Sequence, residues 1–176
     1  GSGAAPVVAQ AARDAGALAV GVVSKPFSFE GARRGQQAAI CLAEMQRCVD
    51  ILITVPNDRL LEIMPELPLR DAFRLADEVL RQGVVGLSDL ILKPGLINVD
   101  FADVQRVVQN GGVALLGIGR GAGEERAADA ACAAVSSPLL ELPMHRAQRI
   151  VYSVTGPSSM SLQEVSTVGE IIAQVA

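Results

Sequence analysis

Two aspartates three residues apart, Asp100 and Asp103, have the spacing of side chains that act together on a water molecule. In a helix they would lie one above the other in the first turn. Acidic residues in a first turn also stabilise a helix by complementing its dipole, without any catalytic role. The preceding loop, however, contains Leu96 and Ile97 and is unusually apolar, which indicates burial against another surface. Beside a nucleoside triphosphate, two carboxylates could hold a water or a cation and orient the nucleophile for in-line attack.

A second pair, Phe73 and Asp77, is spaced by one helical turn. An aromatic ring can stack on a purine, and a carboxylate one turn later can accept hydrogen bonds from the N1–H and N2–H groups of guanine. Adenine lacks these paired donors on that edge, so the two residues would select GTP over ATP. The alternative is a core phenylalanine followed by a surface aspartate, and the spacing alone leaves both interpretations open.

Glu30 and Arg34 are also one turn apart. They form either a surface ion pair or a pair in which the carboxylate accepts from ribose hydroxyls while the guanidinium faces phosphates. The first three residues, Gly1, Ser2 and Gly3, precede a helix-forming segment. Glycines let the backbone approach a phosphate and the helix N-terminus adds N–H donors, although an ordinary turn has the same composition.

The composition argues against several classes of protein. Of the 176 residues half are hydrophobic and 3% are aromatic, so the chain can bury an aliphatic core. A net charge of −4 without a Lys/Arg cluster argues against nucleic acid or an anionic membrane as partner. No apolar run approaches the ~20 residues that span a bilayer. The three cysteines and one histidine lack the spacing of a zinc site, and no complete GxGxxG marks a dinucleotide-binding enzyme.

Apolar periodicity predicts alternating helices and strands, which is an α/β fold with mainly parallel pairing in its first part. Helices are expected at residues 4–15, 29–49, 57–64, 69–92, 100–109, 124–135 and 161–176. Strands are expected at residues 18–24, 51–55, 113–119 and 149–154. The helix at 69–92 would be about 35 Å long, enough to cross a whole domain, and it is the natural boundary between two α/β units. The last helix opens with a capping box at Ser161 and Glu164.

Seven stretches of the sequence resemble the FtsZ family, the tubulin-like division GTPases of bacteria and plastids. They occur in the family's order and spacing across nearly the whole chain: GSGAAPVVAQ, VGVVSKPFSFEGARR, VPNDRLLEI, DAFRLADEVLRQGVVGLSDLI, PGLINVDFADV, ALLGIG and SSPLLE. PGLINVDFADV and the GxG-AAP junction are the most specific of them. The turn at residues 155–160 departs from the family's usual double glycine followed by an acidic residue.

The resemblance implies the C-terminal half of a tubulin-like, Rossmann-type GTPase domain at residues 1–67. A core helix would follow at residues 68–93, and residues 94–176 would form the synergy loop and part of an α/β C-terminal subdomain. The chain is expected to begin inside the glycine-rich phosphate signature and to stop before the last strands and the tail. We therefore expect the isolated chain to be inactive.

The resemblance also assigns roles by position. The nucleotide-binding residues would be Gly1, Ser2, Gly3, Glu30, Arg34, Asn57, Phe73 and Asp77. The catalytic residues of the synergy loop, which in this family completes the active site of the next subunit, would be Asn98, Asp100 and Asp103. GTP or GDP would be the ligand, with Mg²⁺ or K⁺ as a companion ion for which no protein ligand is assigned.

The function implied is that of a GTP-hydrolysing protein that assembles head to tail with itself into a division ring. Membrane-adaptor proteins would bind a tail absent from this chain; neither nucleic acid nor direct membrane insertion is expected. The alternative is a non-catalytic assembly partner, a degenerate paralogue in the same ring. The pieces GSGAAPVVAQ, PFSFEG, IVYSVTG and SLQEV look more like plastid members, which indicates the chloroplast stroma, with a bacterial cytoplasm at the division site as the alternative.

Overall fold

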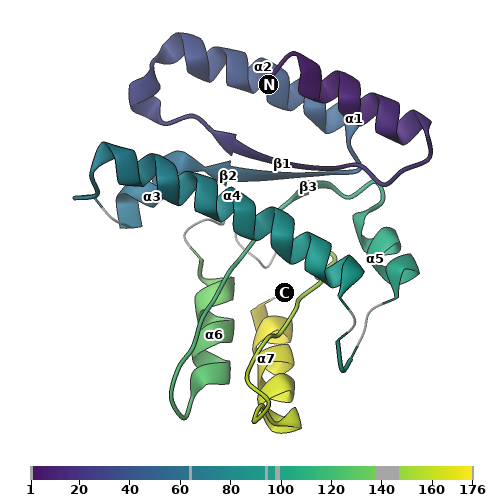
Figure 1. Cartoon of the computed structure of the whole chain (residues 1–176), viewed down its shortest axis with the longest axis vertical. Coiled ribbons are helices and arrows are strands. Elements are labelled where there is room, and N and C mark those ends of the chain that lie inside the picture. Colours follow the sequence, from purple (N-terminus) through teal and green to yellow (C-terminus); the bar gives the residue numbers. More distant parts are fainter. Residues whose placement is uncertain (1, 64, 94, 98–99, 138–146, 176) are drawn as a thin grey trace. The chain divides into compact units, whose positions relative to one another are not determined.

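The structure is a computed structural model that describes residues 2–63, 65–93, 95–97, 100–137 and 147–175 (Figure 1). Two compact units make up the chain, Gly1–Leu115 and Leu116–Ala176. Helices alternate with parallel strands in the first unit, as the α/β prediction requires, and each unit is described separately below.

The sheet of the first unit has three parallel strands in the order β1-β2-β3. They span Val20–Lys25 (β1), Ile51–Pro56 (β2) and Gly112–Ala114 (β3). All six residues of the central strand β2 are buried. A strand covered on both faces needs a continuous apolar run rather than an alternating one, and the run ILITVP satisfies this requirement.

Helices cover both faces of this sheet (Figure 1). Helices α1 (Ala4–Asp14) and α2 (Ala32–Cys48) contact one another along one face, and α4 (Leu69–Leu92) contacts β1 and β2 on the other. Under α2, buried Met45 and Val49 pack on Leu52 of β2. Gly21 permits this close approach, since a Cβ there would lie 2.9 Å from Leu52 Cδ1.

The long helix α4 has the bounds that the periodicity predicts, residues 69–92. Its buried residues recur every three or four positions and so form one face: Ala72, Ala76, Val79 and Gly83. The short helix α3 (Asn57–Ile63) begins directly after β2, and α5 (Phe101–Val108) buries Val104 and Val108. The helix expected at residues 29–49 is divided, because Gly31 at φ +98° separates a 3₁₀ turn, η1 (Ser28–Glu30), from α2.

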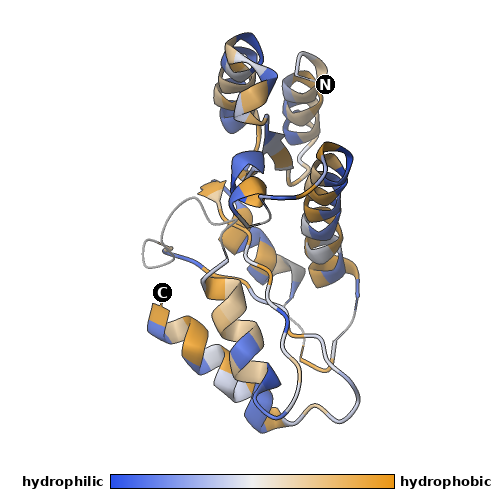
Figure 2. Cartoon of the chain, turned by 90° about the vertical axis from the view of Figure 1, so that its left-hand side faces the viewer, coloured by the Kyte–Doolittle hydropathy of each residue, from blue (hydrophilic) through white to orange (hydrophobic). Residues whose placement is uncertain are grey.

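In its described residues the second unit has two helices, α6 (Arg126–Val135) and α7 (Leu162–Val175), joined to segments outside helices and strands. Ala131 of α6 packs on Val168 and Ile172 of α7. At the start of α7, Ser161 N–H donates to Glu164 at 2.7 Å and Glu164 N–H donates to Ser161 Oγ at 3.2 Å, so the predicted capping box is confirmed. Figure 2 shows hydrophobic and hydrophilic residues on these helices, as one-sided burial requires.

Two strand predictions were wrong in this region. The strand expected at residues 113–119 ends at Ala114, because Gly117 and Gly119 then lie against the backbone of α6 at Ala134 and Ala130 instead of beside another strand. Residues 149–154 form no strand in the described part of the chain. Their apolar side chains, from Ile150 and Val154, pack on the α6–α7 cluster instead. Within the described residues, no helix is long and apolar enough to span a membrane.

Candidate functional site

The carboxyl ends of β1 and β2 lie side by side, with Lys25 opposite Pro56. In parallel α/β sheets ligands bind at this edge, because the loops and helix N-termini that follow the strands converge there. The segment after β1 carries Phe27 and Glu30, and the residue after β2 is Asn57. The fold therefore brings together several residues that the sequence proposes for nucleotide binding.

Glu30 is anchored from two sides. One carboxylate oxygen accepts a hydrogen bond from the Phe27 N–H at 2.9 Å, and the other lies 2.8 Å from Arg34 Nη1. The Glu30 side chain is 12% exposed, whereas that of Arg34 is 69% exposed. The pair thus combines a fixed carboxylate with a guanidinium that faces solvent and has donors left for an anion.

Phe73, at the start of α4, meets two other rings, one from η1 and one from the residue just before it. Its centroid lies 5.3 Å from that of Phe27 and 6.4 Å from that of Phe29. The Phe73 side chain is partly exposed, so it is not the core phenylalanine of the alternative interpretation. Asp77 follows one turn later and is exposed. Residue spacing in the sequence did not identify Phe27 or Phe29 as part of this cluster, although two phenylalanines so close together in PFSF could have indicated an aromatic cluster.

Asn57 is 5% exposed, and its Oδ1 atom accepts no hydrogen bond from any residue that the structure describes. A buried acceptor without a donor costs about 1–3 kcal/mol, so a donor from a bound molecule would relieve that cost. Its neighbour Asp58 accepts a hydrogen bond from the Ser28 N–H at 2.9 Å. This contact, which the sequence did not reveal, ties α3 to the segment after β1.

Two of the three residues proposed to bind the phosphates are among those that the structure describes. Ser2 and Gly3 form an exposed turn before α1, and the Ser2 carbonyl accepts from Cys41 Sγ at 3.3 Å. Gly1 lies outside the described residues.

The two aspartates of the proposed synergy loop lie at the beginning of α5. The main-chain oxygen of Asp100 accepts from the N–H of Asp103 at 2.9 Å, and the Asp103 carboxylate lies 3.3 Å from Arg106. Both aspartates are exposed, and so are Leu96 and Ile97 in the loop before them. Asn98 lies outside the described residues. The apolar loop is therefore not buried by the part of its own chain that the structure describes.

The structure does not bring these aspartates to the cluster around Phe73. Phe73 and Leu92 are both in α4, and at 1.5 Å per residue the helix between them is about 28 Å long. Asp100 is the N-cap residue of α5, and Figure 1 shows α5 near the C-terminal end of that helix. The two groups of candidate residues thus lie at opposite ends of α4.

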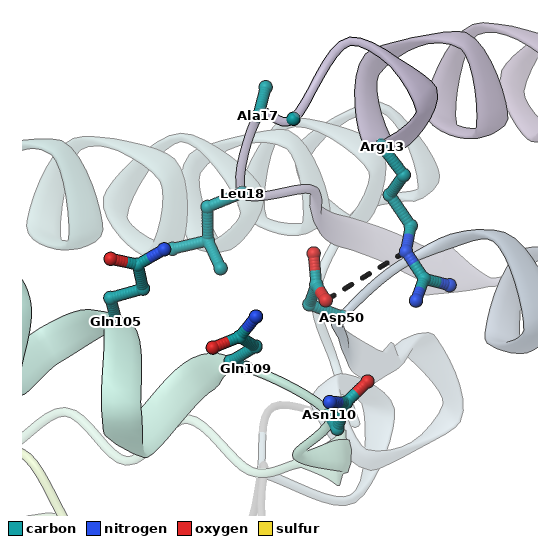
Figure 3. A pocket seen from close by; sticks show the side chains of 8 residues that line it. Arg13, Ala17, Leu18, Asp50, Gln105, Gln109 and Asn110 are labelled. Atoms are coloured by element: carbon teal, nitrogen blue, oxygen red, sulfur yellow. Dashed lines mark ion pairs between the residues drawn. The ribbon is translucent and has the colours of Figure 1, made fainter.

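A polar pocket lies at the other end of the sheet, where the strands begin (Figure 3). In it, buried Asp50 accepts from the Ala19 N–H at 2.9 Å through its side chain and from the Gly112 N–H at 3.1 Å through its main chain. Arg13 lies 3.8 Å from the Asp50 carboxylate. These contacts join the beginnings of the three strands, so Asp50 has a structural role that accounts for its burial.

Comparisons with known proteins match this arrangement over the length of the chain. A sequence model of the Tubulin/FtsZ family, GTPase domain, matches residues 1–65, and one of the FtsZ family, C-terminal domain, matches residues 112–176. An empty FtsZ dimer from M. jannaschii has 43% identity and a TM-score of 0.87, covering 99% of this chain and 50% of that one. A point mutant of the M. jannaschii FtsZ has 41% identity and a TM-score of 0.89, with 99% and 52% covered. The chain spans about half the length of these solved structures.

Proposed function

The chain belongs to the Tubulin/FtsZ family, and from this premise we propose that the protein binds GTP, hydrolyses it to GDP and phosphate, and assembles head to tail into filaments. The family resemblance supports the ligand and the polymer. The same proposal assigns residues 1–67 to the GTPase domain and residues 68–93 to the core helix. It assigns residues 94–176 to the synergy loop and part of the C-terminal subdomain.

The buried Asn57 Oδ1 is the observation that carries the proposal of nucleotide binding. It lies at the ligand-binding edge of the sheet and needs a hydrogen-bond donor. Guanine has two such donors, N1–H and N2–H. In the proposed complex the base stacks on Phe73 and donates to Asn57 and Asp77, while Glu30 accepts from the ribose and Arg34 faces the phosphates. Backbone N–H groups of Gly1, Ser2 and Gly3 would bind the phosphates.

Hydrolysis is proposed to take place between subunits. Asp100 and Asp103 are separated from the base cluster of their own chain by most of α4, so they can serve the nucleotide of an adjacent subunit. Their carboxylates would orient the attacking water and accept its proton, with Asn98 beside them. The exposed apolar side chains of Leu96 and Ile97 provide a surface that the neighbour would bury.

The proposal extends to the cellular role of the filaments and to the ion that accompanies the nucleotide. The filaments would form a division ring held by membrane-adaptor proteins, in the chloroplast stroma or at a bacterial division site. A Mg²⁺ or K⁺ ion would accompany the phosphates, and no residue is assigned to it. We expect this chain in isolation to bind GTP weakly and not to hydrolyse it, because it spans only about half the length of the solved FtsZ structures that it matches.

The test is the dependence of GTP hydrolysis on the concentration of the intact protein. If the site is completed between subunits, the rate per subunit is close to zero below a critical concentration and rises with filament mass, which light scattering and sedimentation measure in parallel. A rate per subunit that is independent of concentration would contradict the intersubunit site. GTP-dependent filaments without hydrolysis would instead identify a non-catalytic assembly partner.

A further inference from the structure

Three of the four phenylalanines in the chain meet at the carboxyl end of β1 and the start of α4. The rings of Phe27 and Phe29 are stacked, with centroids 5.0 Å apart and planes 16° apart. Phe73 stands nearly perpendicular to both, at 86° to Phe27 and 84° to Phe29. Edge-to-face and offset-stacked contacts of this kind are the favoured arrangements of aromatic pairs.

The three rings differ in exposure, and this difference separates their roles. Phe27 is 1% exposed and belongs to the core, whereas Phe29 and Phe73 are 53% and 40% exposed. A core residue that stabilises the fold explains Phe27. Phe29 and Phe73 are about half exposed, so core packing alone does not account for the way they lie together.

The backbone on both sides of Phe29 is held by hydrogen bonds. On one side, Ser28 N–H donates to Asp58 and Phe27 N–H donates to Glu30. On the other, Glu30 N–H donates to the Phe27 carbonyl at 3.1 Å and Gly31 N–H donates to the Ser28 carbonyl at 3.3 Å. The Phe29 ring is thus presented from a rigid turn, stacked on a buried ring.

The perpendicular packing has a consequence for Phe73. Neither neighbouring ring lies parallel to it, so neither is stacked face to face on it, and Phe73 remains 40% exposed. Their contacts with Phe73 nevertheless restrict the rotation of its side chain. The arrangement orients the ring and leaves it available to a ligand.

We propose that Phe29 is a positioning residue for base recognition, which holds the Phe73 ring in the plane on which guanine stacks. Phe29 itself need not contact the nucleotide. The inference rests on the proposed function, since it assigns a purpose to Phe29 only if Phe73 binds the base.

The test is a double-mutant cycle in the intact protein, with Phe29→Leu, Phe73→Leu and the double variant, and equilibrium GTP binding as the readout. Loss of an aromatic pair predicts that Phe29→Leu weakens GTP binding by about 3- to 10-fold. Because Phe29 acts through Phe73, the same substitution has no further effect in the Phe73→Leu background. Phe29→Tyr keeps the ring and retains wild-type affinity. In steady-state hydrolysis Phe29→Leu raises KM and leaves kcat unchanged.

The outcomes separate the inference from the function on which it rests. Wild-type affinity in Phe29→Leu, or losses that multiply in the double variant, would overturn the positioning role while leaving GTP binding intact. No effect of Phe73→Leu would overturn the base-stacking role of Phe73, and absence of GTP binding in the wild type would overturn the proposed function itself. Thermal unfolding of each variant shows whether a substitution causes a general loss of folding. If Phe29→Leu does so, the GTP affinity of Phe29→Tyr, which keeps the ring, decides between the outcomes.

Discussion

The guanidinium of Arg34 lies 2.8 Å from the carboxylate of Glu30, across the junction of η1 and α2. An exposed pair one turn apart is ordinarily worth a few tenths of a kcal/mol. Here the carboxylate is nearly buried and is also bound by the Phe27 N–H, so one of its two anchors remains when Arg34 turns away. The exposed guanidinium can therefore turn to an anion without disturbing the turn that holds Glu30.

Substituting Arg34 should accordingly affect ligand binding more than folding. A charge-assisted contact with phosphate predicts that Arg34→Ala weakens GTP binding by about tenfold or more, with a smaller loss at high salt because screening already weakens that contact. Calorimetric titration with GTP at two salt concentrations measures both effects. Arg33→Ala, which removes the neighbouring exposed arginine, is the matched control. Equal losses in the two variants would argue for a general electrostatic effect.

Asn57→Ala should weaken GTP binding without lowering the stability of the empty protein. Removing a buried acceptor that has no donor leaves the free energy of unfolding unchanged or raises it. In the complex the same substitution leaves a donor on the base unpaired, at a cost of about 1–3 kcal/mol of binding free energy. Chemical denaturation without nucleotide and titration with GTP measure the two quantities. Destabilisation with unchanged affinity would assign Asn57 to the fold alone.

Asp100→Asn should reduce turnover without reducing GTP binding. Asparagine also suits the N-cap position that Asp100 occupies, while the charge that orients water or accepts its proton is lost, so kcat should fall by about 10²-fold or more. Because each subunit would complete the site of the next, the variant should also lower the activity of wild-type neighbours in mixed filaments. GTPase rate against mutant fraction, at constant total protein, measures this effect.

Two results would speak against this intersubunit role. One is a decline that dilution of the wild type explains entirely, with equal binding and assembly. The other is an equal loss in Asp129→Asn, which changes an exposed acidic residue in the first turn of α6 and should behave like the wild type.

The second unit should lose stability in acid through Glu164. A hydrogen bond from Arg126 lowers the pKa of Glu164 from 4.5 to about 2, with help from the Ser161 N–H. The folded form therefore favours the ionised carboxyl, and this contribution to stability is fully present above pH 4.5 and is lost as the pH falls towards 2. Unfolding curves of the wild type and Glu164→Gln should differ at pH 7 and converge over this range.

The control for this prediction is Glu170→Gln, which removes a carboxylate of α7 that accepts a hydrogen bond from Ser166, one turn earlier in the same helix. Its stability should follow the wild type at every pH. Parallel curves for the wild type and Glu164→Gln down to pH 2 would show that the ion pair with Arg126 does not set the acid stability.

Much of the first unit follows from local patterns in the sequence. The bounds of α4 were predicted because apolar residues recur at spacings of three and four, at Phe73, Ala76, Leu80, Val84, Leu87 and Ile91. The strand β2 was predicted because a strand buried on both faces is apolar throughout. Residues 149–154 have the same apolar character, but a strand also needs a neighbour to complete its hydrogen bonds, and the sequence does not specify neighbours. Ile150 and Val154 show the result: they pack on helices.

The candidate site was predictable only in pieces. Spacing along one helix identified Phe73 with Asp77, and Glu30 with Arg34. It could not indicate that Phe29 would meet Phe73, because that contact depends on how β1 and α4 pack together. The buried state of Asn57 likewise depends on tertiary packing that no local pattern encodes.

The register between β2 and β3 pairs Ile51 with Gly112. This long separation in sequence imposes a delay on sheet formation during synthesis on the ribosome. After Pro56 has been synthesised, the chain must extend as far as Gly112 before the second edge of β2 can be covered. At about 5–20 residues per second this interval lasts on the order of 3–10 s. During that time the most apolar strand of the sheet presents unpaired N–H and C=O groups, the kind of edge at which other chains add. The nascent protein is therefore most prone to aggregate while α3, α4 and α5 are being translated, and it is during this interval that binding of a chaperone would be most effective.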